Sequence, residues 1–206
     1  IPRGADAVVR VEQTVRTSSG DGVVIKESVA PGQFVTPRAS HASVGQTVLE
    51  AGALLTPANI GVAATAGAAR VNVYRRPTVA VLATGDELVD IDQVPPAAQI
   101  RNSNQYVLRA LIESAYCEAI VLTVARDNRD ELRRGITDGR GCDVVCLTGG
   151  VSMGTLDLVP DVLRELGATF HIHKMAIKPG RPTIFATMPD GKLVFALPGN
   201  PVSAFV

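Results

Sequence analysis

The chain has 206 residues and no net charge, because 20 Lys and Arg residues balance 20 Asp and Glu residues. This balance removes the electrostatic basis for general nucleic-acid binding, and aromatic residues, at 4%, are too few for base-stacking platforms. No apolar run of about 18 residues occurs, so we expect no membrane span. The three cysteines, Cys117, Cys142 and Cys146, are typical of reduced cytoplasmic thiols rather than of a disulfide framework.

Residues 1–75 are predicted to form a small β-rich domain. Four segments alternate apolar and polar residues in the strand period or lie between turn residues: Ala7–Glu12, Gly22–Glu27, Gln46–Leu49 and Arg70–Tyr74. A short helix is expected from Pro57, with Thr56 as its N-cap and an end near Gly67. Short strands between Gly and Pro turns favour a small barrel or sandwich.

The pattern changes at Arg75-Arg76-Pro77, the predicted domain boundary. Strands and helices then alternate. Strand Thr78–Ala83 is followed by a helix that Ser103 or Asn104 can cap and that runs to about Ala115, and then by Ala119–Ala125, Arg129–Thr137, Val144–Leu147 and Leu158–Leu166. Such alternation predicts a three-layer α/β/α sandwich with a mostly parallel sheet over residues 76–206. Near the end, Thr183–Thr187 and Lys192–Ala196 are predicted to form a hairpin, and a further helix begins at Pro201.

Three glycine-rich turns follow predicted strands of the α/β half: Thr84-Gly85-Asp86-Glu87, Thr148-Gly149-Gly150-Val151-Ser152 and Pro198-Gly199-Asn200-Pro201-Val202-Ser203. A turn of this kind leaves backbone N–H groups without partners, and such groups bind phosphates and other oxyanions. Three of them at strand ends therefore predict a site for a phosphorylated ligand at the carboxyl edge of the sheet.

Carboxylates stand beside these turns. Asp86 and Glu87 follow the first strand, Asp127 follows the second, and Asp157 follows the glycine turn of the third. Carboxylates that converge from separate loops suit a Mg²⁺ ion shared with substrate phosphates. Asp127 also fits a helix cap, as does Asn128, and Asp157 also fits a first-turn residue favoured by the helix dipole.

A basic segment near the end of another strand holds Lys174, Lys178 and Arg181. Cations beside glycine turns suit a phosphate or another oxyanion, although a solvated basic loop gives the same pattern. His41, His171 and His173 do not show metal-ligand spacing with the cysteines.

Taken together, the motifs LATGDEL, RNSNQ, LTGGVSMGTLD, KMAIKPGRP and LPGNPVSA resemble those of the molybdopterin molybdenumtransferases, the family of bacterial MoeA and the gephyrin E domain. The opening IPRGADAVVRVEQT resembles the segment that leads into the family's β-rich domain. The resemblance covers essentially the whole chain.

The resemblance implies a cytoplasmic enzyme of molybdenum cofactor biosynthesis that takes adenylylated molybdopterin and molybdate, cleaves the adenylate in a Mg²⁺-dependent step and releases AMP. Its catalytic residues would be Glu87, Asp127, Asp157, Lys174 and Lys178, with the three acidic residues at the metal. Its molybdopterin-binding residues would be Thr84, Gly85, Asp86, Ser103, Asn104, Thr148, Gly149, Gly150, Ser152, Pro198, Gly199, Asn200, Pro201 and Ser203. A homodimer is expected, with a molybdoenzyme or a molybdopterin adenylyltransferase as a partner.

The chain departs from the family pattern at four places, one of them three residues long. Thr36 replaces an Arg, Ala39-Ser40-His41 replaces Gly-Glu-Asp, Asn102 replaces an Asp and Pro160 replaces a Lys. These changes predict that the protein binds and uses molybdate less well, whereas its molybdopterin-binding residues are retained. They also leave an alternative function, that of a scaffold protein that binds molybdopterin without turnover. A molybdopterin adenylyltransferase is the second alternative. The resemblance also predicts a fragment that lacks the family's N-terminal domain and its C-terminal β domain.

Overall fold

The computed structural model describes residues 1–151 and 158–206. The chain divides into two compact units, Ile1–Val73 and Tyr74–Val206, and each is described by itself. The predicted site residues Ser152 and Asp157 lie outside the described residues. No helix in the described part of the chain is long and apolar enough to cross a membrane.

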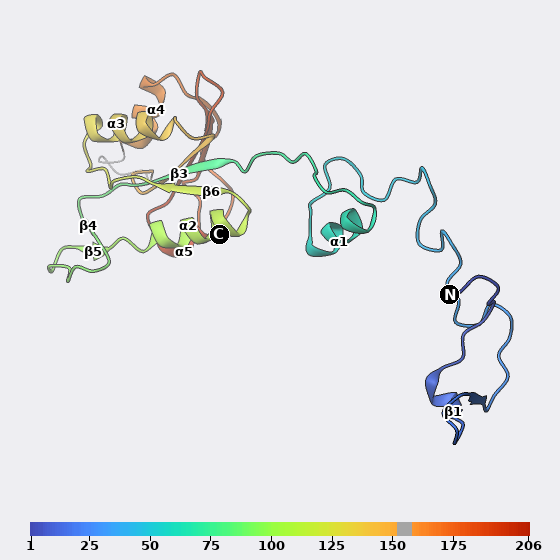
Figure 1. Ribbon diagram of the computed structural model, residues 1–206. Helices are drawn as coiled ribbons and strands as arrows, with labels where there is room; N and C mark the ends of the chain where they lie inside the picture. Colours follow the sequence, from blue (N-terminus) through green and yellow to red (C-terminus); the bar gives the residue numbers. More distant parts are fainter. Residues whose placement is uncertain (152–157) are drawn as a thin grey trace. The chain divides into compact units, whose positions relative to one another are not determined.

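The first unit contains a hairpin and a helix (Figure 1). A 3-10 turn, η1 (Val11–Gln13), leads into β1 (Thr14–Arg16), which pairs antiparallel with β2 (Val23–Ile25). Helix α1 (Pro57–Thr65) begins as predicted, because the side chain of Thr56 accepts a hydrogen bond from the N–H of Asn59.

Three strands expected in the first unit do not form. Ala7–Glu12 ends in the turn η1, Gln46–Leu49 enters a bend, and Arg70–Tyr74 has no ladder partner. Alternation predicts a strand only where another backbone is available to pair with it. Within residues 1–73, all of which are described, β1 and β2 are the only strands that pair. The first unit therefore contains one hairpin, and the expected barrel or sandwich does not form.

The second unit is built on a six-stranded sheet in the order β6-β3-β7-β10-β9-β8. These strands are Glu118–Val121 (β6), Thr78–Ala83 (β3), Val144–Thr148 (β7), Leu193–Leu197 (β10), Ile184–Thr187 (β9) and Thr169–Ile172 (β8). The first four are parallel, and β9 runs antiparallel to both of its neighbours. The predicted hairpin is therefore β9–β10, and the predicted mostly parallel sheet is confirmed.

Helices cover both faces of this sheet (Figure 1). Helices α3 (Arg129–Gly139) and α4 (Val159–Glu165) pack on the face that presents Leu82, Val145 and Val194. Helix α2 (Asn104–Ser114) packs on the opposite face and contacts the short helix α5 (Pro201–Phe205). The three-layer α/β/α arrangement predicted from the alternation is thus present, with the larger core on the α3–α4 side.

The register of the central strands brings the three glycine turns together. Ala83 at the end of β3 lies opposite Thr148 at the end of β7, and Thr148 lies opposite Leu197 at the end of β10. Each glycine turn starts at or directly after one of these aligned residues. A separate short pair, β4 (Leu88–Val89) with β5 (Ile100–Arg101), follows the first turn.

Candidate functional site

A cavity of about 440 Å³ lies at the carboxyl edge of the sheet, where the three turns meet. Its lining residues are Thr84, Gly85, Glu87, Asp127, Gly149, Gly150, Val151, Pro182, Pro198, Gly199, Asn200 and Ser203. We call it the glycine-turn cavity. All three predicted turns contribute to it, as does a carboxylate from the loop after β6.

The first turn is held by the ends of two neighbouring strands. The N–H of Thr84 donates to the carbonyl oxygen of Thr148, and Thr84 is only 3% exposed. Gly85 has a φ of +148° and lies directly beneath the carboxylate of Glu87, so any Cβ at this position would overlap that carboxylate. Because Gly85 has no side chain, the carboxylate of Glu87 can lie against its backbone at the cavity wall.

Asp127 is a fixed carboxylate of the site rather than a helix cap. The hydroxyl of Thr84 donates to its Oδ1 at 3.0 Å, and the N–H of Asp86 donates to its Oδ2 at 3.4 Å. In return, the N–H of Asp127 donates to Oδ1 of Asp86 at 3.4 Å. Helix α3 is capped instead by Asn128, which accepts from the N–H of Glu131. The capping alternative for Asp127 is thus excluded.

The second turn brings backbone close to backbone. Gly149 has a φ of +100°, and a Cβ there would overlap the carbonyl oxygen of Thr84. Gly150 has a φ of +62°, and a Cβ there would lie 3.0 Å from a methyl group of Val159. Both positions need glycine for the backbone itself, so the backbone of this turn, without side chains, forms part of the cavity wall.

The third turn is tied to the second by one buried side chain. Nδ2 of Asn104 donates to Oγ1 of Thr148 and to the carbonyl oxygen of Gly199, both at 2.8 Å. Oδ1 of Asn104 is buried and has no hydrogen-bond partner among the described residues. Asn200 begins α5 and accepts from the N–H groups of Val202 and Ser203. The N–H groups at this helix start are therefore partly satisfied within the chain.

A second, smaller cavity of about 260 Å³ adjoins the first and shares Thr84, Glu87, Gly199 and Asn200 with it. Its other lining residues are Leu88, Ile100, Arg101, Asn102, Ser103, Asn104, Thr148 and Pro201. The predicted binding residues Ser103, Asn104 and Pro201 therefore lie here. We call it the Asn104 cavity.

Of the basic segment 174–182, only Pro182 lines the glycine-turn cavity. Pro182 lines the glycine-turn cavity, and a Cβ at Gly180 would lie 3.5 Å from the carbonyl oxygen of Ser203 in α5. The side chains of Lys174 and Lys178 are exposed, and neither lines the two cavities. Their predicted role as cations at the site stays a prediction.

Among the described residues, no cluster of three or more His, Cys, Asp or Glu side chains could hold a metal ion. Glu87 and Asp127 do line the same cavity, and the third predicted metal residue, Asp157, is outside the described residues. Two carboxylates at one cavity match the usual Mg²⁺ site, in which one or two carboxylates act with substrate phosphates. The donor set that is described therefore fits Mg²⁺.

Residues not predicted from the sequence also line the site, namely Val151, Pro182, Leu88, Ile100 and Arg101. Pro182 belongs to the KPGRP motif, so the motif was a usable signal for it. Of the four departures, Asn102 lines the Asn104 cavity and Pro160 is buried in α4. Thr36 and His41 are exposed residues of the first unit, where His41 lines a separate cavity.

Comparison with known families gives two matches along the chain. Residues 80–206 match the family described as "Probable molybdopterin binding domain", and residues 1–67 match "MoeA N-terminal region (domain I and II)".

Individual relatives agree with these matches. Over its whole length the chain is 38% identical to a molybdopterin molybdenumtransferase of Nostoc sp., covering 48% of it, and 37% identical to one of Haemophilus influenzae, covering 50%. A solved structure of a molybdopterin biosynthesis MoeA protein from Pyrococcus horikoshii is similar with a TM-score of 0.74 and 32% identity, over 99% of this chain and 50% of that one. The chain thus spans about half the length of the curated relatives it matches.

Proposed function

Because the chain belongs to the molybdopterin-binding domain family, with a MoeA N-terminal region before that domain, we propose that it acts as a molybdopterin molybdenumtransferase. The proposed substrates are adenylylated molybdopterin and molybdate, and the proposed product beside the finished cofactor is AMP. The observation that supports this most directly is the glycine-turn cavity, which joins three backbone turns to Glu87 and Asp127.

The turns are proposed to bind the phosphate groups of the substrate. N–H groups at glycine turns and helix starts favour anions through hydrogen bonding and through the local dipole. Asn104 holds two of the turns in fixed relation, and Thr84 holds the first turn to Asp127. A cradle whose parts are already fixed binds its ligand with less ordering cost.

Glu87 and Asp127 are proposed to hold Mg²⁺, with Asp157 as a third group by the resemblance. When bound, the ion would neutralise charge on the phosphate oxygens of the substrate. Thr84 and the N–H of Asp86 orient the Asp127 carboxylate, so its position does not depend on the ligand. Lys174 and Lys178 are proposed to attract the anionic substrates from their exposed positions.

The proposal includes a homodimer and a cytoplasmic location, both of which depend on the family resemblance. The match of residues 1–67 to a MoeA N-terminal region favours the transferase over a molybdopterin adenylyltransferase. The exposed Thr36 and His41, at places where the family carries charged residues, favour a binding scaffold as the second candidate.

One assay separates the candidates. The protein is mixed with adenylylated molybdopterin, molybdate and Mg²⁺, and AMP release is followed by chromatography. The transferase requires AMP release that depends on molybdate and on Mg²⁺, whereas the scaffold binds molybdopterin and releases no AMP. An adenylyltransferase would instead form the adenylylated compound from molybdopterin and ATP.

A further inference from the structure

The sheet of the second unit ends at β6, which pairs with β3 on one side and, in the part of the chain that the structure describes, with no strand on the other. At the start of β6, the N–H of Glu118 donates to the carbonyl oxygen of Pro77 at 2.9 Å. Because the direction of N–H and C=O groups alternates along a strand, those of Ala119 and Val121 point away from β3. The edge of the sheet therefore offers unpaired backbone groups to another strand.

The pairing of this edge with β3 becomes irregular directly after β6. The N–H of Leu122 donates to the carbonyl oxygen of Val81, and the N–H of Ala125 donates to that of Ala83, both at 2.9 Å. Three steps along one chain thus match two steps along the other, which is the geometry of a β-bulge. A bulge at an edge limits further pairing, so an added strand would be confined to the length of β6.

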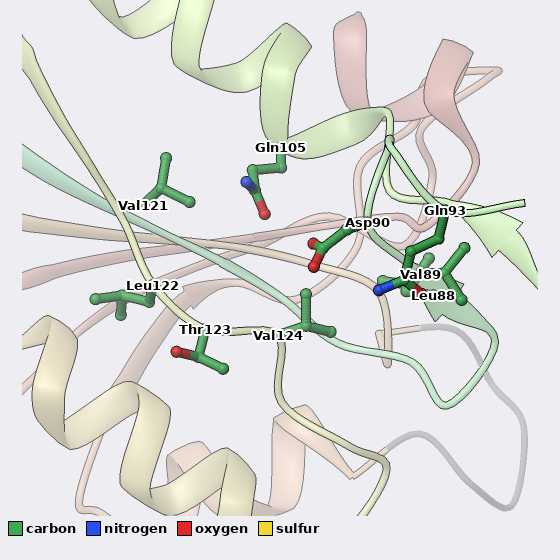
Figure 2. A pocket seen from close by; sticks show the side chains of 9 residues that line it. All are labelled: Leu88, Val89, Asp90, Gln93, Gln105, Val121, Leu122, Thr123 and Val124. Carbon is green, nitrogen blue, oxygen red and sulfur yellow. The ribbon is translucent and has the colours of Figure 1, made fainter.

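A cavity of about 300 Å³ lies beside this bulge, between the segment after β6 and α3. It is lined by Leu122, Thr123, Val124, Ala125, Glu131, Arg134, Gly135 and Asp138. We call it the edge cavity. Figure 2 shows Leu122 and Thr123 pointing to the side of the sheet where α3 lies, whereas Val121 points to the side of α2. The edge cavity shares no lining residue with the glycine-turn cavity or the Asn104 cavity, so the proposed function leaves it without a role.

The floor next to the edge cavity is apolar. Ile120 lies opposite Ala80, whose side chain belongs to the core on the α3 side. Helix α3 packs on β3 and β7, and Ile120 on β6 is left 38% exposed. At Gly135, a Cβ would overlap the side chain of Leu82 in β3, so the helix lies close to that strand. The apolar floor therefore continues from the cavity to the open edge of the sheet.

Charged side chains of α3 form the rim of the edge cavity. Glu131, Arg134 and Asp138 are three and four residues apart, so they lie on one face of the helix. The carboxylate of Glu131 accepts from the backbone N–H of Arg126 at 2.9 Å, and this hydrogen bond lowers the pKa of Glu131. Two carboxylates against one guanidinium leave the rim with an excess of negative charge, which favours a cationic partner.

We propose that the β6 edge and the edge cavity bind an extended segment of another protein, in which basic residues alternate with β-branched residues. The segment adds a strand to β6 and pairs with its unpaired backbone groups. Its basic side chains lie with their hydrocarbon stems over Ile120 and Leu122, and their charged ends reach Glu131 and Asp138. Binding at this edge is separate from the proposed transferase activity, which does not require it.

Titrations of the whole chain with three peptides test the proposal. The first is acetyl-Val-Lys-Val-Lys-Val-Lys-Val-amide, and the other two carry Gln or Glu in place of every Lys. We expect the Lys peptide to bind about tenfold more tightly than the Glu peptide, with the Gln peptide between them. In nuclear magnetic resonance spectra, the Lys peptide should shift the N–H signals of Ala119 and Val121 and slow their hydrogen exchange.

Charge variants of α3 test the choice of a basic partner. Glu131→Gln and Asp138→Asn should each weaken binding of the Lys peptide by about threefold, whereas Arg134→Gln should tighten it. Gln at position 131 still accepts from the N–H of Arg126, so the start of α3 is preserved. The control is Asp130→Asn, an exposed carboxylate of the same helix that does not line the cavity, which should change the dissociation constant by less than about 1.5-fold.

Backbone pairing is tested on both partners. Ala119→Pro removes an N–H that points away from β3, so the fold should be retained while the Lys peptide binds about tenfold more weakly. The second test needs no variant and uses Lys peptides that are N-methylated at all Val or at all Lys nitrogens. Because alternate N–H groups of an added strand face β6, one of these two peptides should lose binding and the other should keep it.

The proposal is overturned if the Lys, Gln and Glu peptides bind equally, or if Arg134→Gln weakens the Lys peptide as Glu131→Gln does. It is also overturned if N-methylation has the same effect at both sets of positions. Sedimentation experiments on the wild type and Ala119→Pro test a different occupant. Self-association that Ala119→Pro abolishes would assign the β6 edge to a second copy of this chain and contradict the proposed partner.

Discussion

Nδ2 of Asn104 and the carbonyl oxygen of Gly199 lie 2.8 Å apart, and this hydrogen bond joins the start of α2 to the turn after β10. The same nitrogen reaches Oγ1 of Thr148 at the end of β7. Two of the three turns of the glycine-turn cavity thus depend on one side chain, which gives the first prediction.

Asn104→Ala should lower the free energy of unfolding by about 1 kcal/mol, because the loss of two buried hydrogen bonds is partly offset by removal of the unpartnered Oδ1. Molybdopterin affinity should fall as well, since the turns lose their fixed spacing. Urea unfolding and a binding titration measure the two effects. Asn72→Ala, an exposed position in the first unit, is the control, and equal affinity in both variants would contradict the prediction.

Alanine substitutions at two glycines of the cavity should differ in their effect on the free energy of unfolding. Gly199→Ala adds a methyl group at ordinary contact distance, 3.6 Å from Cα of Gly149, so the fold should be retained while ligand affinity falls. Gly149→Ala should instead cost about 1–3 kcal/mol of stability, because φ is +100° and a Cβ would overlap the carbonyl oxygen of Thr84. Thermal unfolding and molybdopterin titration of both variants check this. Gly199→Ala with unchanged affinity would show that the third turn does not approach the ligand.

Glu87→Gln should reduce the rate of AMP release about a hundredfold and leave the fold intact. The substitution keeps the size of the side chain over Gly85 and removes a charge at the proposed metal-assisted step. Single-turnover AMP release measures the rate, and Glu118→Gln, an exposed carboxylate on β6, is the matched control. Normal turnover of the Glu87→Gln variant would contradict a role for Glu87 in the reaction.

Thr36→Arg combined with His41→Asp should lower the molybdate concentration needed for half-maximal AMP release, with little change in molybdopterin binding. Arg offers a bidentate donor to an oxyanion, which Thr36 cannot do. Both positions belong to the first unit, whereas the glycine turns belong to the second. If molybdate dependence is unchanged in the double variant, these positions are surface substitutions without a role in the reaction.

Asp143 should make the stability of the second unit depend on pH. The Arg75 guanidinium, at 2.5 and 2.6 Å, and the N–H of Thr78 at 2.8 Å hold the pKa of the Asp143 carboxyl well below its ordinary value of 3.8. A carboxyl with a depressed pKa stabilises the folded state above its unfolded-state pKa, and this stabilisation is lost as the pH falls below that value.

The measurement is the difference in melting temperature between the wild type and Asp143→Asn over a range of pH. We expect the variant to be less stable at neutral pH and the difference to shrink as the pH falls below about 4. Asp130→Asn, whose side chain is 86% exposed, should show little difference at any pH. A constant difference for Asp143→Asn would mean that its charge is not what stabilises the unit.

Local sequence patterns determined most of the second unit. The continuous apolar run Thr78–Ala83 is a strand with the predicted bounds, and Asn128 and Pro201 begin helices near the predicted places. These features follow from periodicity, capping and proline geometry, which act over a few residues. The same reasoning failed at Ala7–Glu12 and Gln46–Leu49, where a strand needed a distant backbone that the first unit does not offer.

Only the tertiary structure decided which residues share a site. Asp127 had two local interpretations, and the helix-cap interpretation was excluded because Asn128 caps α3. The bond of Asp127 to Thr84, 43 residues away, holds its carboxylate at the glycine-turn cavity, where its role in the reaction stays a prediction. The register of Ala83, Thr148 and Leu197 aligned three turns that the sequence showed only as separate motifs. In the sequence, Asn102 was only one of four departures from the family pattern. The structure shows that it lines the Asn104 cavity and that its Nδ2 donates to Oε1 of Gln105. Pairings over such distances depend on how strands stack into a sheet, and no short stretch of sequence encodes that.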